Sequence, residues 1–177
     1  MRPASCRLMD STQLKLAAAI REETAHGPFR SALRTAFLRA NGIRLEEAAA
    51  ATLVFEGTRD EVAAQVRALV SLVRDAGGVW GGKDSGEAGY ALTFAIAYLR
   101  DFGLDYHILS ESLETMAPWS KISQVWPAVV AAVEAEHQLL RLPGRPFLSC
   151  RMTQLYTEGG VLYMYLAVCT AGLRPSK

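Results

Sequence analysis

The stretch FLSCRMTQLYTEGGVLYMYLAV, residues Phe147–Val168, shows the clearest local pattern in the chain. Polar and apolar residues alternate on both sides of Thr157–Gly160, which is typical of two strands, Phe147–Tyr156 and Val161–Val168, joined by a tight turn. One face of this hairpin carries Ser149, Arg151, Thr153, Tyr163 and Tyr165, and the other carries Leu148, Cys150, Met152, Leu162, Met164 and Leu166. We therefore predict an antiparallel hairpin with one side in the core and one polar side.

A second informative stretch, GYALTFAIAYLRDFGLDYHILSESLETMAPWSK, spans Gly89–Lys121. It predicts a buried helix, apolar nearly all round, that ends at Arg100 and is followed by a strand over Leu104–Ser110. The acidic, hydroxyl-rich residues Glu111–Thr115 are expected to form a turn, and Pro118 fits the first position of the next helix. A buried helix that ends in an arginine suggests that the arginine is being positioned for a function.

The remaining sequence predicts more strands and helices, in the overall order β-α-α-β-α-α-β-α-β-β. The segment Thr58–Glu61 matches a capping box at the start of a helix that Gly77 and Gly78 end. Pro127 should kink a helix whose apolar stripe is Ile122, Val125, Trp126, Val129 and Val133. The other elements are expected at Pro3–Met9, Gln13–Ile20, Phe29–Leu38, Ala51–Glu56 and from Asp84 onward. This order favours an α+β fold, an antiparallel or mixed β-sheet flanked by helices, with polar residues on the open face.

Composition limits the class of protein. The 177 residues fit one domain, residues 1–177, with half of the residues apolar and 19 Lys+Arg against 18 Asp+Glu. No basic block interleaves with aromatics, so we expect no nucleic-acid partner. No apolar run reaches the ~18 residues that a transmembrane segment needs. The three cysteines lie far apart and are expected to be reduced thiols, with no zinc or other metal site.

Residues Gly77–Asp84 nearly spell a phosphate-binding loop. Asp84 stands where a Ser or Thr must bind magnesium, and a helix precedes the segment where a strand is required. We therefore interpret it as a glycine-rich connection between helices.

The polar side of the sheet is the strongest candidate site. With Arg7 on the polar side of the first strand, it would present Arg7 and Arg151 beside Tyr163 and Tyr165. Arginine suits bidentate recognition of a phosphate or a carboxylate. A solvated face with ordinary ion pairs is the alternative. Arg100 also has a purely structural explanation, since a cation at a helix C-terminus gains ~0.3–1 kcal/mol from the helix dipole.

Several segments together resemble one family. They are PASCRLMD (Pro3–Asp10), ATLVFEGTRDEV (Ala51–Val62), GYALTFAIAYLRD (Gly89–Asp101), ESLETMAPW (Glu111–Trp119), and CRMTQLY with VLYMYLAV in the last hairpin. The chain is similar to the C-terminal, substrate-binding half of FAD-linked oxidases of the vanillyl-alcohol oxidase type, and most to the alkyldihydroxyacetonephosphate (alkylglycerone-phosphate) synthases of ether-lipid synthesis. The resemblance implies a cap domain, an antiparallel sheet flanked by helices, packed over an FAD that a separate N-terminal domain mostly holds.

The resemblance also implies a reaction and its residues. In such synthases the fatty acid of acyl-dihydroxyacetone phosphate leaves and a long-chain alcohol takes its place, without net redox change. The family's catalytic arginine falls on Arg100 in AYLRD, its catalytic tyrosine on Tyr163 in VLYMY, and a further important arginine on Arg7 in RLMD. We expect the substrate's phosphate or carboxylate to be bound by Arg7 and Arg151, with the nearby residues Glu114, Thr115 and Tyr165.

The chain departs from the family pattern at both ends. It ends at Lys177, before the histidine cluster that follows the final hairpin in the synthases, and the FAD-binding domain is absent before Met1. We therefore expect a fragment or the product of a split gene, cytoplasmic or peripheral to a membrane, inactive alone, and with homodimer formation left open. Two other functions stay open: the cap of an FAD-dependent 2-hydroxy-acid or phenolic dehydrogenase, and a non-catalytic module that binds an anion, a lipid or a partner subunit.

Overall fold

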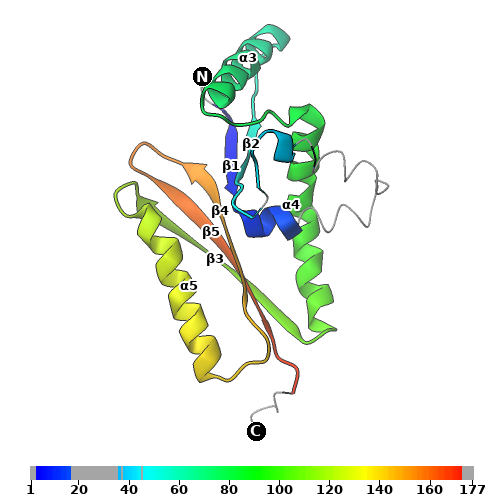
Figure 1. Ribbon diagram of the computed structural model, residues 1–177, viewed down its shortest axis with the longest axis vertical. Coiled ribbons are helices and arrows are strands. Elements are labelled where there is room, and N and C mark those ends of the chain that lie inside the picture. Colours follow the sequence, from blue (N-terminus) through cyan, green and yellow to red (C-terminus); the bar gives the residue numbers. More distant parts are fainter. Residues whose placement is uncertain (1–2, 17–35, 37, 45, 173–177) are drawn as a thin grey trace. The chain divides into compact units, whose positions relative to one another are not determined.

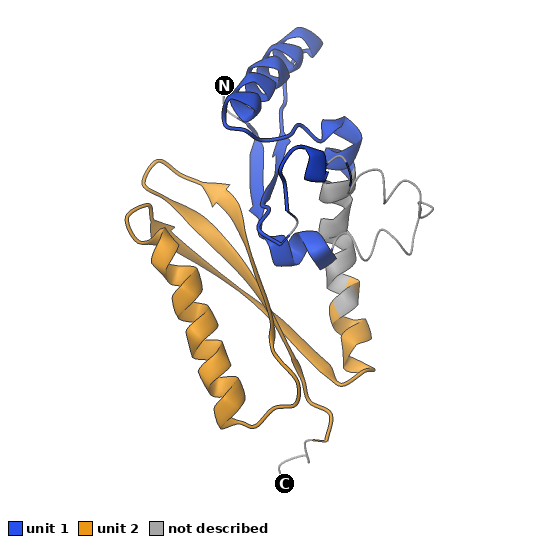
Figure 2. Cartoon of the chain, in the orientation of Figure 1, with its two compact units in different colours: residues 1–92 blue, residues 93–177 orange. Residues whose placement is uncertain are grey.

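The computed structural model describes residues 3–16, 36, 38–44 and 46–172, without the side chains of residues 88–97 and 99. The chain divides into two compact units, Met1–Leu92 and Thr93–Lys177 (Figures 1 and 2), and each is considered by itself. Within the described part of the chain, no helix has both the length and the apolar character needed to cross a membrane.

The first unit contains an antiparallel pair of strands, β1 (Ser5–Met9) and β2 (Ala50–Val54). Both strands were predicted, and Arg7 lies opposite Thr52. The helix predicted from Gln13 begins earlier, at Ser11, because the Asp10 carboxylate accepts a hydrogen bond from the Gln13 backbone N–H at 2.8 Å and caps it. The second half of that helix, and most of the helix predicted over Phe29–Leu38, lie outside the described residues.

Helix α3 (Arg59–Asp75) begins with the predicted capping box. The Thr58 hydroxyl accepts from the Glu61 backbone N–H at 3.4 Å, and the Glu61 carboxylate accepts from the Thr58 backbone N–H at 2.8 Å. The Thr58 backbone N–H and the Thr58 hydroxyl, which lies 2.8 Å from the same oxygen, both donate to the Glu61 carboxylate and hold the pKa of Glu61 below its usual value. The helix ends before Gly77, whose φ of 72° suits a residue without a Cβ. The glycine-rich segment therefore joins α3 to another helix, as predicted, and cannot be a strand-to-helix phosphate loop.

Helix α4 (Gly82–Leu104) corrects the prediction for Arg100. The helix continues one turn beyond Arg100, and the Arg100 side chain is 60% exposed, 4.0 Å from the Asp101 carboxylate. The neighbouring Tyr98 and Phe102 are also exposed, so the described end of α4 is not the buried segment that its apolar sequence suggested. His107, with a φ of 59°, then turns the chain into the next strand.

Strand β3 (Ile108–Pro118) corrects two further predictions. Glu111–Thr115 forms no turn; it pairs residue by residue with β5 (Gly159–Cys169), and Pro118 is the last paired residue, opposite Gly159, rather than the first residue of a helix. Polar and charged side chains are well tolerated along such a sheet edge, and Pro is tolerated where no ladder N–H is needed. Within the second unit, β3 pairs on one side only.

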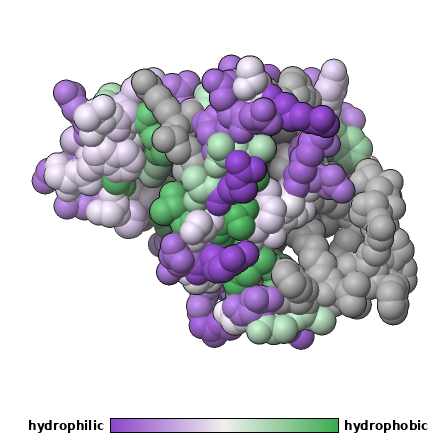
Figure 3. All heavy atoms as spheres, turned by 90° about the horizontal axis from the view of Figure 1, so that it is seen from above, coloured by the Kyte–Doolittle hydropathy of each residue, from purple (hydrophilic) through white to green (hydrophobic). Residues whose placement is uncertain are grey.

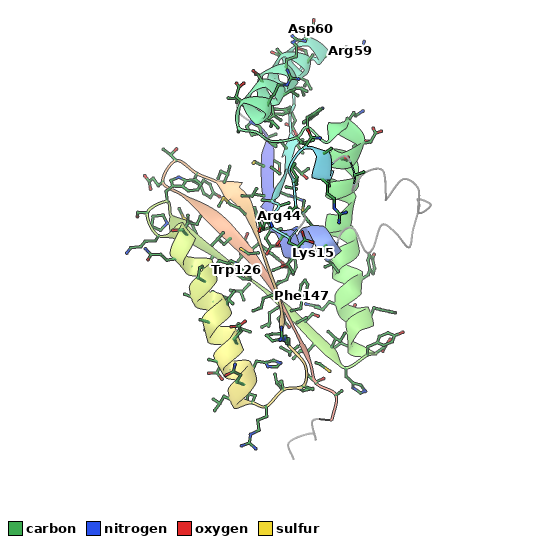
Figure 4. The ribbon with its side chains drawn as sticks, viewed as in Figure 1. Lys15, Arg44, Arg59, Asp60, Trp126 and Phe147 are labelled. Atoms are coloured by element: carbon green, nitrogen blue, oxygen red, sulfur yellow. The ribbon has the colours of Figure 1, made fainter. Side chains whose placement is uncertain are left out.

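The second unit is a three-stranded antiparallel sheet in which β5 pairs with both β3 and β4 (Phe147–Leu155). Helix α5 (Ile122–Leu139) covers one face of this sheet (Figure 1) and contains Pro127, and the kink expected at Pro127 stays a prediction. The core consists of Cys150, Leu162 and Met164, packed against the helix side chains Ile122, Val125, Trp126 and Val129 and against Met152. Trp126 is labelled in Figure 4. The predicted hairpin, the stripe on α5 and the α+β class are confirmed.

Large apolar side chains also reach the surface. Figure 3 shows hydrophobic residues exposed among hydrophilic ones in a view from above. In the second unit, several of them follow one another in the apolar stretch 98–109, whose exposed members are Tyr98, Phe102, Leu104, Tyr106, Ile108 and Leu109. An exposed patch of this kind is typical of a surface that contacts another molecule or domain.

Candidate functional site

The face of the β3–β5–β4 sheet away from α5 carries the candidate site, which we call the polar face. The register places Glu114, Tyr163 and Arg151 in one row across the three strands. The next row contains Ser112, Tyr165 and Ser149. Because side chains alternate along strands, both rows lie on the same side of the sheet, opposite the core residues Met164 and Leu162.

Arg151 is the centre of the polar face. Its Cζ atom lies 4.7 Å from the centre of the Tyr163 ring and 5.3 Å from that of the Tyr165 ring, and the two rings are 5.0 Å apart. A guanidinium over aromatic faces gains about 0.5–2 kcal/mol, depending on how far it is desolvated. Arg151 is half-buried, and neither Arg151 nor Glu114 has an ion-pair partner within 4.0 Å among the described residues. The described residues of the polar face therefore do not form the ordinary ion pairs that were the alternative interpretation.

Two hydrogen bonds fix the other side of this row. The Tyr163 hydroxyl lies 2.9 Å from Ser112 Oγ, so that a side chain of β3 holds the phenol of β5. Thr153 Oγ1 donates to Glu114 Oε1 at 3.1 Å, across the intervening strand. The register of β4 shifts between Met152 and Gln154, and such an irregularity redirects a side chain. The shift therefore explains how Thr153 reaches Glu114.

Two buried donors on the polar face have no hydrogen-bond partner among the described residues. One is Oγ of Ser149, a residue that is 0% exposed, and the other is the buried Nε of Arg151. An unsatisfied buried donor costs about 1–3 kcal/mol, so native structures keep few of them without a reason.

The structure does not bring all of the predicted residues to this face. Thr115 lies opposite Leu162, so alternation places it on the other side of the sheet from Glu114. Arg7 belongs to strand β1 of the first unit and is engaged in an interaction of its own. The predicted placement of Arg7 beside Arg151 stays a prediction. No hydrogen bond, ion pair or ring contact joins Arg100 to Tyr163 among the described residues.

Sequence reasoning missed Ser112 and Ser149 as members of the site. Ser149 had a signal, since it alternates with Cys150 on the same side as Arg151. Ser112 had none, because its segment was expected to be a turn and its contact with Tyr163 spans 51 positions of sequence.

Comparison with known proteins assigns the family. Residues 1–175 match the model of the FAD linked oxidases, C-terminal domain. The chain belongs to this family. It is 35% identical over 175 residues to an alkyldihydroxyacetonephosphate synthase of Caenorhabditis elegans, a match that covers 97% of this chain and 29% of that protein. The resemblance inferred from the sequence is therefore confirmed, and family membership implies FAD in the full-length protein.

Solved structures agree in fold. Two structures of alkyldihydroxyacetonephosphate synthase, in space groups P212121 and P1, align with a TM-score of 0.72 at 18% and 19% identity. Each alignment covers 96% of this chain and 31% of the other. The chain thus spans less than a third of the length of the relatives that it matches.

Two parts of this FAD-linked oxidase C-terminal domain can be compared as ligand-binding sites, the glycine-rich segment after α3 and the polar face. The glycine-rich segment after α3 lacks the strand-to-helix geometry that would hold a diphosphate. The polar face, in contrast, offers a guanidinium, two phenols and two unpaired donors on a three-stranded support. This set suits the recognition of a substrate anion and the transfer of a proton to or from a bound substrate.

Proposed function

We propose that this chain is the substrate-binding and catalytic cap of an FAD-dependent enzyme of the alkyldihydroxyacetonephosphate synthase type, which exchanges the acyl group of acyl-dihydroxyacetone phosphate for an alkyl group. The observation that carries the proposal is the 35% identity over 97% of the chain to a synthase. The polar face supports it, because it gathers anion-binding and proton-transferring side chains on a rigid sheet.

In this proposal Tyr163 is the catalytic residue of the polar face. Its hydroxyl is held by Ser112, and its ring lies beneath the Arg151 guanidinium, so the phenol has a defined direction in which to give or take a proton. Arg100 is the second proposed catalytic residue. Because its side chain is exposed at the end of α4, it is free to approach a substrate or cofactor brought by another part of the protein.

The remaining predicted residues are proposed to bind substrate. Arg151 and Tyr165 are suited to it by their stacking on the polar face, and Glu114 by its fixed carboxylate. Thr115 and Arg7 are retained as weaker candidates, since Thr115 lies on the opposite face and Arg7 in the other unit.

FAD is proposed to be held mainly by a separate domain, in the same or another chain, and to supply the ring system on which the acyl substrate is activated. The apolar stretch 98–109 is the proposed contact with that domain. Six of its large side chains are exposed, and none of them belongs to the apolar core formed by the described residues. The corresponding location is the cytoplasm, where the enzyme would act on lipid substrates at a membrane surface.

The test is a chimera in which this chain replaces the matching segment of the C. elegans synthase. The chimera is given acyl-dihydroxyacetone phosphate and a labelled long-chain alcohol, and the alkyl product is measured against the unaltered synthase. We expect the chimera to bind FAD and to form alkyl product. We also expect Arg100→Ala to abolish most of that activity and the exposed-loop variant Arg145→Ala to retain it.

The same assay separates the competing functions. If the chimera's flavin is reduced by a 2-hydroxy acid or a phenol, and no alkyl product forms, the chain is the cap of a dehydrogenase and the proposal is wrong. If the chimera folds without flavin absorbance, the chain is better described as a binding module.

A further inference from the structure

The two unpaired donors of the polar face lie close to each other. Ser149 and Arg151 are two positions apart on β4, which puts their Cα atoms about 6.6 Å apart on the same side of the strand. The Arg151 guanidinium lies over both tyrosine rings, and Tyr165 is the residue directly opposite Ser149. The arginine side chain therefore spans both rows of the polar face, and its buried Nε and the buried Ser149 Oγ both lack a hydrogen-bond partner among the described residues.

The stacking of Arg151 leaves its hydrogen-bonding edge unused. Aromatic faces interact with the flat side of a guanidinium, whereas its N–H groups point outward in the plane of the group. No described carboxylate meets that edge, since Glu114 accepts its hydrogen bond from Thr153 and forms no ion pair with Arg151. The Glu114 strand lies two strands away in the same row, but the Glu114 carboxylate reaches Thr153 on β4, two residues from Arg151, so an anion at Arg151 would bind against the partial repulsion of one carboxylate.

We propose that Ser149 and Arg151 form a subsite for a single oxyanion, a phosphate monoester or a carboxylate, with Nε–H of Arg151 and the Ser149 hydroxyl as its donors. This inference deepens the proposed function, and it rests on that function for the identity of the natural substrate. It explains why the fold keeps two buried donors unpaired: an oxyanion accepts from both at once, and hydrogen bonds to a charged acceptor are stronger than those between neutral groups.

The two oxyanions in the proposed reaction are the phosphate of dihydroxyacetone phosphate and the carboxylate of the released fatty acid. Both would use the same donors, so the probes must distinguish them. Inorganic phosphate and dihydroxyacetone phosphate represent the first, acetate and decanoate represent the second, and dihydroxyacetone without phosphate is the neutral control.

The experiment measures binding of these probes to the 177-residue chain by titration calorimetry, at constant ionic strength set with chloride. The variants are Ser149→Ala and Arg151→Lys, with Ser120→Ala and Arg145→Lys as matched changes at exposed positions. Each protein is also unfolded in urea without probe. We expect Ser149→Ala and Arg151→Lys to weaken oxyanion binding about tenfold or more, because each removes a hydrogen bond to a charged group, and the two control variants to bind like the parent.

Ser149→Ala gives a second readout that a purely structural serine would not. Removing an unpaired buried hydroxyl relieves its desolvation, so the probe-free variant should unfold at a urea concentration equal to or higher than that of the parent while binding the oxyanion more weakly. Unchanged phosphate and carboxylate binding in this variant would overturn the inference and leave an ordinary buried water as the explanation of the donors. Binding of all probes no stronger than of chloride would overturn it as well.

The outcomes separate this inference from the proposed function. A chimera that forms alkyl product, with anion binding unaffected by Ser149→Ala, keeps the function and removes the subsite. A chain whose phosphate binding depends on Ser149, in a chimera that forms no alkyl product, keeps the subsite and removes the function.

Discussion

Gly159 should be required for the pairing of β3 with β5. It is the first residue of β5 and lies opposite Pro118, and a Cβ atom added there would be 2.2 Å from the Ala117 carbonyl oxygen and 2.9 Å from Pro118 Cα. These neighbours are backbone atoms, so the strands must separate by about 1 Å. Overpacking of this kind costs about 1–3 kcal/mol, and each weakened hydrogen bond adds about 0.5–1.5 kcal/mol. We therefore expect Gly159→Ala to lower the free energy of unfolding by about 2–4 kcal/mol.

The assay is urea unfolding followed by tryptophan fluorescence. Trp119 reports directly on this end of the sheet, because its Nε1–H lies 3.1 Å from the carbonyl oxygens of both Tyr156 and Thr157. The matched control is Gly86→Ala in α4, where an added Cβ meets no atom within 4 Å and where alanine favours the helix by about 0.5–1 kcal/mol. The two Gly→Ala changes should thus have opposite signs. A Gly159→Ala protein as stable as the parent would refute the pairing of β3 with β5.

Four other outcomes follow from the structure. Met164→Ala, at a core residue 1% exposed, should cost about 2–5 kcal/mol in urea unfolding, whereas Leu155→Ala, 48% exposed, should cost far less. Thr58→Ala should cost about 0.5–2 kcal/mol by removing the helix cap. Because the pKa of Glu61 is lowered on folding, its contribution is present at neutral pH and disappears as the pH falls through that lowered value, so the stability gap between the parent and Glu61→Gln should shrink in acid. Burial raises the pKa of the Cys6 thiol, so its labelling by a thiol reagent at pH 7 should be slower than that of an exposed thiol and should accelerate at higher pH; labelling as fast as that of free cysteine would contradict this.

Elements with strong local signals were predictable from the sequence. The hairpin of β4 and β5 combines alternation with a turn, the start of α3 has a complete capping box, and α5 has an apolar stripe that packs on Met164 and Leu162. In each case the signal lies within a few residues of the structure that it specifies.

Strand β3 was mispredicted because its stability comes from its partner. Its residues Glu111–Thr115 have the composition of a turn, and only pairing with β5, some fifty positions further along the chain, makes them a strand. Tertiary context overrides weak strand propensity in this way, most easily at a sheet edge. The same long-range pairing creates the contact of Ser112 with Tyr163, which no local pattern contains.

The end of α4 shows a different limit. Its sequence is apolar, and apolar helices are usually buried, but the described side chains of Tyr98 and Phe102 are 78% and 58% exposed. A sequence pattern states that a surface is suited to burial and does not state which molecule or domain buries it. The exposure of Arg100, which was expected to be buried, has the same origin.

The central claim is that the polar face serves the acyl-for-alkyl exchange, and the most direct test is the rate of alkyl product formation by the chimera carrying Tyr163→Phe. Tyr156→Phe, which removes the hydroxyl of a tyrosine that is 51% exposed beyond the end of β4, is the matched control. We predict a loss of about a hundredfold or more for Tyr163→Phe, the usual contribution of a proton-transferring group, and an unchanged rate for Tyr156→Phe. A Tyr163→Phe chimera as active as the parent chimera would contradict that claim.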